Sequence, residues 1–268
     1  MRVRAVVAYD GTNYQGFQRQ TNGPTVQEVL ERALEQVTGE PVTILAAGRT
    51  DTGVHAEGQV VAFDTEWKHS LAALLRALNA MLPPDVAVRE VAPAPPDFHP
   101  RYDALSRYYR YTIYNHPVRS PLARRTSFHI AWPLDVAAMQ AAADLLVGEH
   151  DFAAFGTPPK GENTIRRVLR AQWQADPPWL YFDIEANAFL YRMVRTLVGT
   201  MIRVGLGRLP VEGVREILVS GDRRRAGPAV PPYGLCLMAV RYPDEEPWNP
   251  QIVESRSDEC EDVRHQTR

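Results

Sequence analysis

The sequence contains very little cysteine and lysine, and it has no long apolar run. Its two cysteines, Cys236 and Cys260, form no Cys-x-x-Cys pair, which argues against a disulfide framework and indicates a reducing, cytoplasmic setting. No stretch approaches the roughly eighteen apolar residues of a membrane span, and the short, strand-like start of the chain does not resemble a signal peptide. We therefore expect a cytoplasmic protein with no membrane partner.

Motifs for metals and nucleotides are missing as well. The seven histidines show no His-x-x-x-His spacing and no pairing with cysteine, so no metal site is expected. There is no Gly-x-x-x-x-Gly-Lys loop, and the glycines over residues 11–16 lack the spacing of a dinucleotide-binding loop. We accordingly expect a protein that works without a cofactor.

The net charge of −2 conceals an uneven distribution. From Asp244 onward the chain has eight acidic and three basic residues, which leaves 24 acidic and 27 basic residues in the remainder. Only Lys68 and Lys160 are lysines, and the abundant arginine suits RNA because its guanidinium binds phosphate through two N–H groups and stacks on bases. A GC-rich genome would produce the same excess of arginine, so composition alone does not identify an RNA-binding protein.

Hydrophobic periodicity and capping signals predict an α+β fold of two ferredoxin-like β-α-β-β-α-β units with a central cleft. In the first unit, residues 1–96, the Thr25-x-x-Glu28 capping box and Ser70 begin the two helices. Its strands are expected at residues 2–9, 42–46, 58–63 and 85–91. The proline-rich residues 92–96 form a stiff link to the second unit.

The second unit, residues 97–243, repeats this order of elements. Its strands are expected at residues 107–115, 166–175, 179–186 and 235–242. Its helices are expected from Asp135 to Gly148 and over residues 189–204, with a shorter helix over residues 211–219 inserted before the last strand. Residues 244–268 are polar and charged without any period, and we expect them to be disordered.

The loop over residues 46–59 has the richest chemistry in the chain. It lies between two apolar, strand-like runs and contains three glycines together with Arg49, Asp51 and His55. Loops held by a rigid scaffold often carry catalytic groups, and glycine lets the backbone approach a ligand closely. Arg49 would favour the ionised carboxylate of Asp51 and could also hold a phosphate. Taken alone, an Asp in such a loop more often caps a turn or pairs structurally with a neighbouring arginine.

The nine residues from Gly48 to Ala56, Gly-Arg-Thr-Asp-Thr-Gly-Val-His-Ala, resemble the signature of the tRNA pseudouridine synthase A family. The match is long and contiguous, so it is far more specific than a lone glycine motif. The resemblance implies that Asp51 is the catalytic carboxylate. His55 would either contact RNA beside Asp51 or serve as a hydrogen-bonded structural histidine.

Two further stretches carry the resemblance. Arginine and tyrosine alternate over residues 107–114 with the period of a strand, which would combine a phosphate grip such as Arg107 with a stacking surface such as Tyr109. An ordinary strand with one buried aromatic face is equally compatible with this pattern. In the family, the tyrosine that Tyr109 matches stacks on the target base. The Met-Val-Arg motif ending at Arg195 resembles one whose arginine pairs with the catalytic Asp, and helical spacing would place Arg192 on the same face.

The resemblance covers the chain from Arg2 to about Pro243. It implies a homodimeric enzyme that converts uridine to pseudouridine at positions 38–40, in the anticodon arm of tRNA, without a cofactor. One alternative is a non-catalytic RNA-binding protein on the same fold, which would have no use for Asp51. Another is a glycoside or nucleoside hydrolase, which would want a second carboxylate; Glu57 and Asp64 are candidates only by their distance in the sequence.

Overall fold

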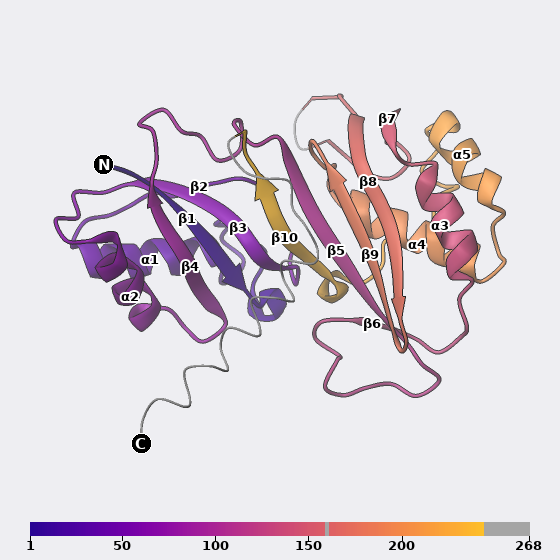
Figure 1. Ribbon diagram of the computed structural model, residues 1–268, viewed down its shortest axis with the longest axis horizontal. Helices are drawn as coiled ribbons and strands as arrows, with labels where there is room; N and C mark the ends of the chain where they lie inside the picture. Colours follow the sequence, from indigo (N-terminus) through magenta and orange to yellow (C-terminus); the bar gives the residue numbers. More distant parts are fainter. Residues whose placement is uncertain (159–160, 244–268) are drawn as a thin grey trace, which may run out of the picture.

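The computed structural model describes residues 1–158 and 161–243, which form a mixed α+β fold (Figure 1). In chain order its strands and α-helices are β1 (Arg2–Tyr9), α1 (Val26–Thr38), β2 (Leu45–Ala46), β3 (His55–Asp64), α2 (Leu71–Met81), β4 (Val86–Pro93), β5 (Ser106–Asn115), β6 (Phe128–Ile130), α3 (Val136–Asp144), β7 (Gly148–Asp151), β8 (Ile165–Asp176), β9 (Trp179–Ala186), α4 (Met193–Gly205), α5 (Val211–Ser220) and β10 (Leu235–Arg241). The predicted order is confirmed in both halves. The second half adds the short strands β6 and β7, which were not predicted.

The strands form one ten-stranded sheet in the order β4-β1-β3-β10-β5-β9-β8-β7, with β2 paired to β3 and β6 paired to β5. In the first half the neighbouring strands are β4-β1-β3-β2, and in the second half they are β10-β5-β9-β8. In both halves the order is therefore fourth, first, third and second strand. This is the arrangement of a ferredoxin-like unit, so the predicted fold class is confirmed. The two units share a single sheet, because β3 and β10 pair with each other.

The junction between the units lies along one edge of β3. At its far end, Ala62 and Val61 pair with the two residues of β2. At its beginning, His55 and Ala56 pair with β10 in parallel register. Between these two places a Cβ atom on Gly58 would overlap the carbonyl oxygen of Met238, so glycine allows the two backbones to come close. The edge that β2 leaves free is therefore used to attach the second unit.

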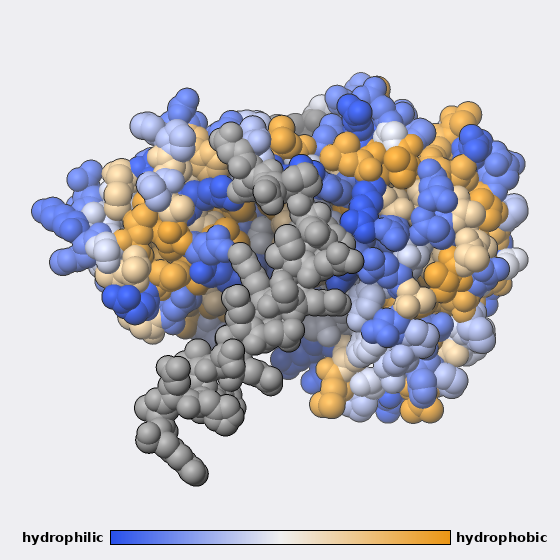
Figure 2. Space-filling view, in the orientation of Figure 1, coloured by the Kyte–Doolittle hydropathy of each residue, from blue (hydrophilic) through white to orange (hydrophobic). Residues whose placement is uncertain are grey.

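The helices cover one face of this sheet. In Figure 1, α1 lies behind β1 and β4, and α4 lies behind β8 and β9. Helix α1 begins where the Thr25 hydroxyl accepts a hydrogen bond from the Glu28 N–H, and it ends at Gly39, which has a φ of 80°. Its apolar side chains pack on the sheet, as their predicted spacing required. Seen in the same orientation, Figure 2 shows hydrophilic residues over most of the visible face, with apolar residues more frequent toward the two ends.

Two predicted strand boundaries were wrong. The strand predicted over residues 42–46 is reduced to Leu45–Ala46, which pair with Ala62 and Val61. Strand β3 begins at His55 instead of Gly58, because pairing with β10 draws three more residues into the sheet. As a result, His55 is a strand residue and the true loop runs only over residues 47–54.

The helix predicted from residue 189 begins later, at Met193. Tyr191 instead forms an isolated bridge with Thr157, in which the backbone of each residue donates to the other at 2.9 and 3.3 Å. Arg192 then takes a left-handed conformation with a φ of 64° and occupies the N-cap position. The expectation that Arg192 and Arg195 share a helical face was therefore wrong.

None of the helices in residues 1–158 and 161–243 combines the length and the apolar composition needed to cross a bilayer. The segment expected to be disordered, residues 244–268, lies outside the described residues.

Candidate active site

The loop over residues 47–54 is fixed to the first unit from several directions. The carbonyl of Gly48 accepts a hydrogen bond from Gln59 Nε2 at 2.8 Å, and the hydroxyls of Thr50 and Tyr9 lie 2.7 Å apart. Gly53 has a φ of 76° and packs against Pro232, which belongs to the second unit. The loop is thus a supported structure that faces the junction of the two units.

Asp51 projects from this loop toward helix α4. Its Oδ2 atom accepts a hydrogen bond from Arg195 Nη1 at 3.2 Å, and the Asp51 side chain is 22% exposed. Arg195 also donates through Nε to the carbonyl of Val230 at 2.7 Å, which leaves its guanidinium little freedom. The structure therefore brings together the carboxylate and the arginine that the resemblance singled out, from residues 144 positions apart.

Burial raises the pKa of Asp51 above its ordinary value. The positive charge and hydrogen bond of Arg195 lower it again, and the charge of Arg192 lowers it by a smaller amount. Burial changes the pKa more than the two arginines do, so the net pKa of the Asp51 carboxyl is higher than that of a carboxyl in water. Such a group is more basic than an ordinary Asp, which suits a nucleophile or a general base.

Tyr109 lies on β5, beside Asp51. Its ring is buried and meets the ring of Phe189 edge to face, with 5.1 Å between the ring centroids. Burial raises the pKa of the Tyr109 phenol, and the negative charge of Asp51 raises it further. Tyr109 is therefore a protonated phenol on which the charge of the Asp51 carboxylate acts.

Arg49 does not support Asp51 as the sequence suggested. Its side chain is exposed and forms no ion pair with any residue that the structure describes. The charges that act on Asp51 come from Arg195 and Arg192. The expected effect of Arg49 on the Asp51 carboxylate was therefore wrong, whereas its exposure leaves the predicted phosphate contact open.

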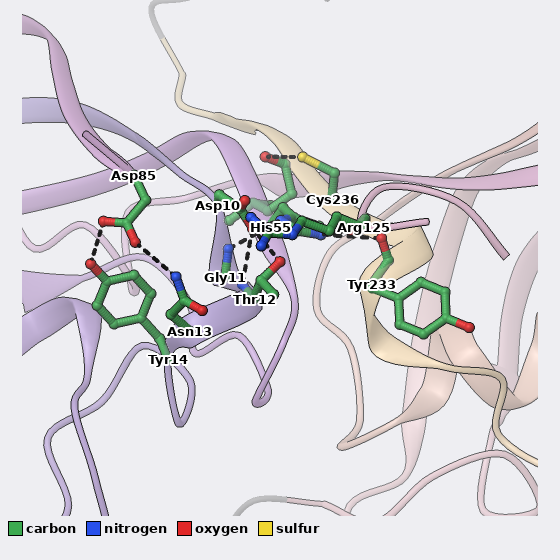
Figure 3. A network of polar contacts seen from close by, with 11 residues as sticks. Asp10, Gly11, Thr12, Asn13, Tyr14, His55, Asp85, Arg125, Tyr233 and Cys236 are labelled. Atoms are coloured by element: carbon green, nitrogen blue, oxygen red, sulfur yellow. Dashed lines mark hydrogen bonds and ion pairs between the residues drawn. The ribbon is translucent and has the colours of Figure 1, made fainter. Parts of the chain in front are cut away.

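His55 is a hydrogen-bonded structural residue at the start of β3 (Figure 3). Its Nδ1 atom accepts a hydrogen bond from the Gly11 N–H at 3.0 Å. Its Nε2 atom lies 2.8 Å from the carbonyl of Arg125 and 3.1 Å from that of Tyr233, so Nε2 carries the proton and donates. The ring is buried and both nitrogens are used, so the structural alternative describes His55 in this structure.

Arg107 is also buried and cannot grip a phosphate in this structure. Its guanidinium donates to the main-chain carbonyls of Ala47 (2.9 Å), Arg101 (2.6 Å), Ala104 (3.3 Å) and Asn187 (2.9 Å). The sequence predicted a phosphate grip at Arg107, and the structure instead binds this guanidinium to main-chain carbonyls. The predicted alternation of side chains between the two faces of β5 was correct. The side chains of Tyr108 and Arg110, on the face opposite Arg107, also bind other protein groups.

The opposite face of β5 holds a polar cluster that the sequence analysis missed. Asp183 on β9 is fully buried and accepts hydrogen bonds from Tyr108 at 2.6 Å and from Arg110 through two nitrogens at 2.8 and 2.9 Å. These side chains therefore form a structural network and no stacking surface. Asp183 gave no signal in the sequence, because a single acidic residue in a strand is usually exposed.

Within the described residues, no group of three or more His, Cys, Asp or Glu side chains is arranged to hold a metal ion. The two carboxylates considered as partners for Asp51 are engaged elsewhere. Glu57 pairs with Arg89 at 2.8 Å, and Asp64 pairs with Arg2 at 2.7 Å. A two-carboxylate hydrolase mechanism therefore has no support from this arrangement.

Comparison with known proteins identifies the family. The model of the tRNA pseudouridine synthase family matches residues 5–103 and 142–243. The chain is 46% identical over 245 residues to tRNA pseudouridine synthase A of Syntrophotalea carbinolica, covering 91% of this chain and 97% of that protein. It is 47% identical over 241 residues to the protein of the same name from Geobacter sulfurreducens, covering 90% and 99%. The chain belongs to the tRNA pseudouridine synthase family.

Proposed function

We propose that this protein converts uridine to pseudouridine at positions 38–40 of tRNA, in the anticodon arm, with Asp51 as its catalytic carboxylate. Membership of the family supports the isomerase reaction and the tRNA substrate, and it disfavours a non-catalytic RNA-binding role. The observation that carries the assignment to Asp51 is its 3.2 Å contact with Arg195, formed between the two units and beside a buried tyrosine.

The reaction breaks the bond from uracil N1 to the ribose, turns the base and rejoins it to the sugar through C5, where a proton is released. Asp51 supplies the nucleophile or general base for these steps. Arg195 holds the carboxylate in place and opposes the effect of burial on its pKa, so that enough of it is ionised near neutral pH.

Tyr109 is proposed to stack against the uracil once the base has left the RNA stack. Extruding a base costs a few kcal/mol, and an aromatic face can return on the order of 1–3 kcal/mol. Because burial and the nearby Asp51 charge raise the pKa of the phenol, Tyr109 remains protonated and is a poor proton acceptor. Of these two groups, Asp51 is thus the better acceptor for the C5 proton.

We further propose that the enzyme acts in the cytoplasm as a homodimer that holds one tRNA across both subunits. The exposed Arg49 at the edge of the catalytic loop would contact a phosphate of this tRNA. Sedimentation of the protein alone tests the dimer, because a monomer at micromolar concentration would contradict it.

The decisive experiment measures tritium release from tRNA labelled at uracil C5. Asp51→Asn should lower the rate at least ~10³-fold, while tRNA binding stays within a few fold of wild type. Asp64→Asn is the matched control, because it makes the same change at an exposed carboxylate, and it should release tritium normally. Turnover by Asp51→Asn would remove the catalytic assignment, and tRNA binding without release by wild type would favour the non-catalytic alternative.

A further inference from the structure

Residues 116–126, between β5 and β6, form an arm that extends beyond the sheet at the lower edge of Figure 1. The side chain of Leu122 is 97% exposed and that of Val118 is 67% exposed. The base of the arm is closed by the buried Ser127, whose hydroxyl donates to the carbonyl of Ala123 at 2.8 Å. The arm thus has a fixed base and an exposed tip.

The charge of this arm has one sign. The sequence contains no acidic residue between Asp103 and Asp135. Arg119, Arg124 and Arg125 are exposed, and none forms an ion pair with any residue in the described ranges. Exposed arginines elsewhere are of both kinds: Arg224 pairs with Asp222 at 2.8 Å, whereas Arg76 and Arg208 form no ion pair with a described residue. The basic arm therefore differs from an ordinary solvated surface, where charges of both signs alternate.

The base of the arm is attached next to the catalytic loop. The carbonyl of Arg125 accepts the hydrogen bond from His55 Nε2, and the same nitrogen lies near the carbonyl of Tyr233 (Figure 3). His55 is the first residue of β3 and follows Asp51 by four positions. One imidazole ring therefore joins the basic arm, the end of the catalytic loop and the segment before β10.

We propose that the basic arm binds the sugar-phosphate backbone of the tRNA whose uridine enters the active site, with Arg119 and Arg124 on separate phosphates. This inference rests on the proposed function. Phosphates are the favoured partners, because the unpaired guanidinium groups of Arg119 and Arg124 on one exposed segment gain most from a dense line of negative charge, whereas the charge of Arg125 already acts on the Asp10 carboxylate. The position of His55 would keep the arm in register with the Asp51 loop.

The test compares the salt dependence of tRNA binding in wild type, Arg119→Gln/Arg124→Gln and the control Arg89→Gln, which alters an arginine paired with Glu57 on the first unit. Loss of two phosphate contacts should make the slope of log affinity against log salt shallower by about 1.4–1.8, and weaken binding at least tenfold at low salt. The control should keep the wild-type slope. An unchanged slope in the double variant would overturn the proposal.

A second variant separates RNA binding from contact with another copy of the chain. Leu122→Ser should leave the sedimentation coefficient of the protein unchanged. If it instead dissociates an oligomer while the double arginine variant keeps the wild-type slope, the arm is a protein contact and the proposal is wrong. Tritium release by wild type at saturating tRNA reports on the proposed function separately, because it does not depend on which surface holds the RNA.

A different observation supports a second inference, concerning Arg107. Its side chain is 9% exposed, and burial lowers its pKa, as expected for a cation removed from water. The partners that replace water are four carbonyls, and no carboxylate lies within ion-pair distance among the described residues. Ala47 is the first residue of the loop that carries Asp51, and Asn187 lies two residues before Phe189, the ring that packs on Tyr109.

The geometry points to Arg107 as a positioning residue that fixes the Asp51 loop relative to Tyr109. Arg107→Ala should lower kcat at least tenfold with KM within about threefold, and added guanidinium should restore part of kcat, whereas methylammonium should not. Arg107→Lys, which keeps the charge and preserves folding better, should also lose kcat, because an ammonium group cannot reach four carbonyls. A rise in KM with unchanged kcat would overturn the proposal and indicate a phosphate contact.

Discussion

The two units of the sheet have the same strand order but differ in the connection between their second and third strands. In the second unit, β8 and β9 pair from end to end across a turn at Pro177 and Pro178, with Asp176 opposite Trp179. In the first unit, β2 has only two paired residues, and the connection to β3 is the loop over residues 47–54. The connection that is a plain hairpin in one unit is the loop that carries Asp51 in the other.

The short β2 has two structural consequences. It frees the loop that carries Asp51, and it leaves the beginning of β3 available for β10. The residues at the beginning of β3, which a longer β2 would have paired with, pair with β10 and so join the first unit to the second. This junction brings Arg195 to the loop that carries Asp51. The proposed active site lies at the junction because both features come from one truncated strand.

The third strands of the units show a related difference. Each has a polar side chain that is fully buried, Gln59 on β3 and Asp183 on β9. Gln59 donates to Gly48 in the catalytic loop, whereas Asp183 holds Arg110 and Tyr108 within the sheet. We therefore expect substitution of Gln59 to act on turnover and substitution of Asp183 to act on stability.

The largest expected effect is that of Asp183→Ala. It leaves the Arg110 guanidinium and the Tyr108 hydroxyl without their buried acceptor, and it should reduce the free energy of unfolding by about 3–5 kcal/mol. Asp64→Ala, which removes an exposed pair with Arg2, should cost less than about 1 kcal/mol. Urea unfolding of both variants tests this difference, and equal losses would contradict it.

Arg195→Gln should lower kcat about a hundredfold, which corresponds to ~3 kcal/mol, and should change its pH dependence. Burial already raises the pKa of Asp51 above the ordinary value of 3.8, and Arg195 opposes this effect. Activity requires the ionised carboxylate, so it falls as the pH drops through this raised pKa. Without Arg195 the fall should occur at a higher pH. Arg203→Gln, farther along α4, should leave the profile in place; no shift in Arg195→Gln would exclude the electrostatic role.

Gln59→Leu should lower kcat about tenfold, because losing one hydrogen bond of ~1 kcal/mol loosens the loop at Gly48. The unfolding free energy should fall by only about 1 kcal/mol, because the Gly48 carbonyl loses one donor while an apolar side chain of similar size fills the space. Gln172→Leu on β8 makes the same chemical change in the second unit, away from the loop. Single-turnover rates that fall equally in both variants would argue against a specific role for Gln59.

The smallest effects are expected at the two equivalent helix caps. Thr25 caps α1 and Asp135 caps α3, each accepting a hydrogen bond from a backbone N–H three residues later. Replacing either with Ala should cost ~1 kcal/mol of unfolding free energy, and the two losses should add because the caps lie in different units. Thermal unfolding of the single and double variants checks this, and a clear departure from additivity would show that the units are more tightly coupled.

The elements with strong local signals could be predicted from the sequence. The caps at Thr25, Ser70 and Asp135 begin helices where expected, because capping depends on residues only three positions apart. The contact between Asp51 and Arg195 was reached through the family resemblance, since no local pattern relates two residues so distant in the chain.

The remaining features depend on tertiary contacts. The alternation of β5 was visible, but the burial of Arg107 required carbonyls from two distant segments, at Ala47 and Asn187, and that of Arg110 required Asp183 on another strand. The late start of α4 required the bridge between Thr157 and Tyr191, which no helical periodicity encodes. The start of β3 at His55 was missed because its partner there is β10, the final strand of the sheet.

The central place of β10 has a consequence for the order of events during synthesis. This strand is made last of all those in the sheet, yet it lies between β3 and β5 and is the only neighbour they share in the strand order. Until residues 235–241 have left the ribosome, the carboxylate and its arginine belong to two pieces that nothing in the sheet holds together. We therefore expect the contact between Asp51 and Arg195 to form only after this strand has been made.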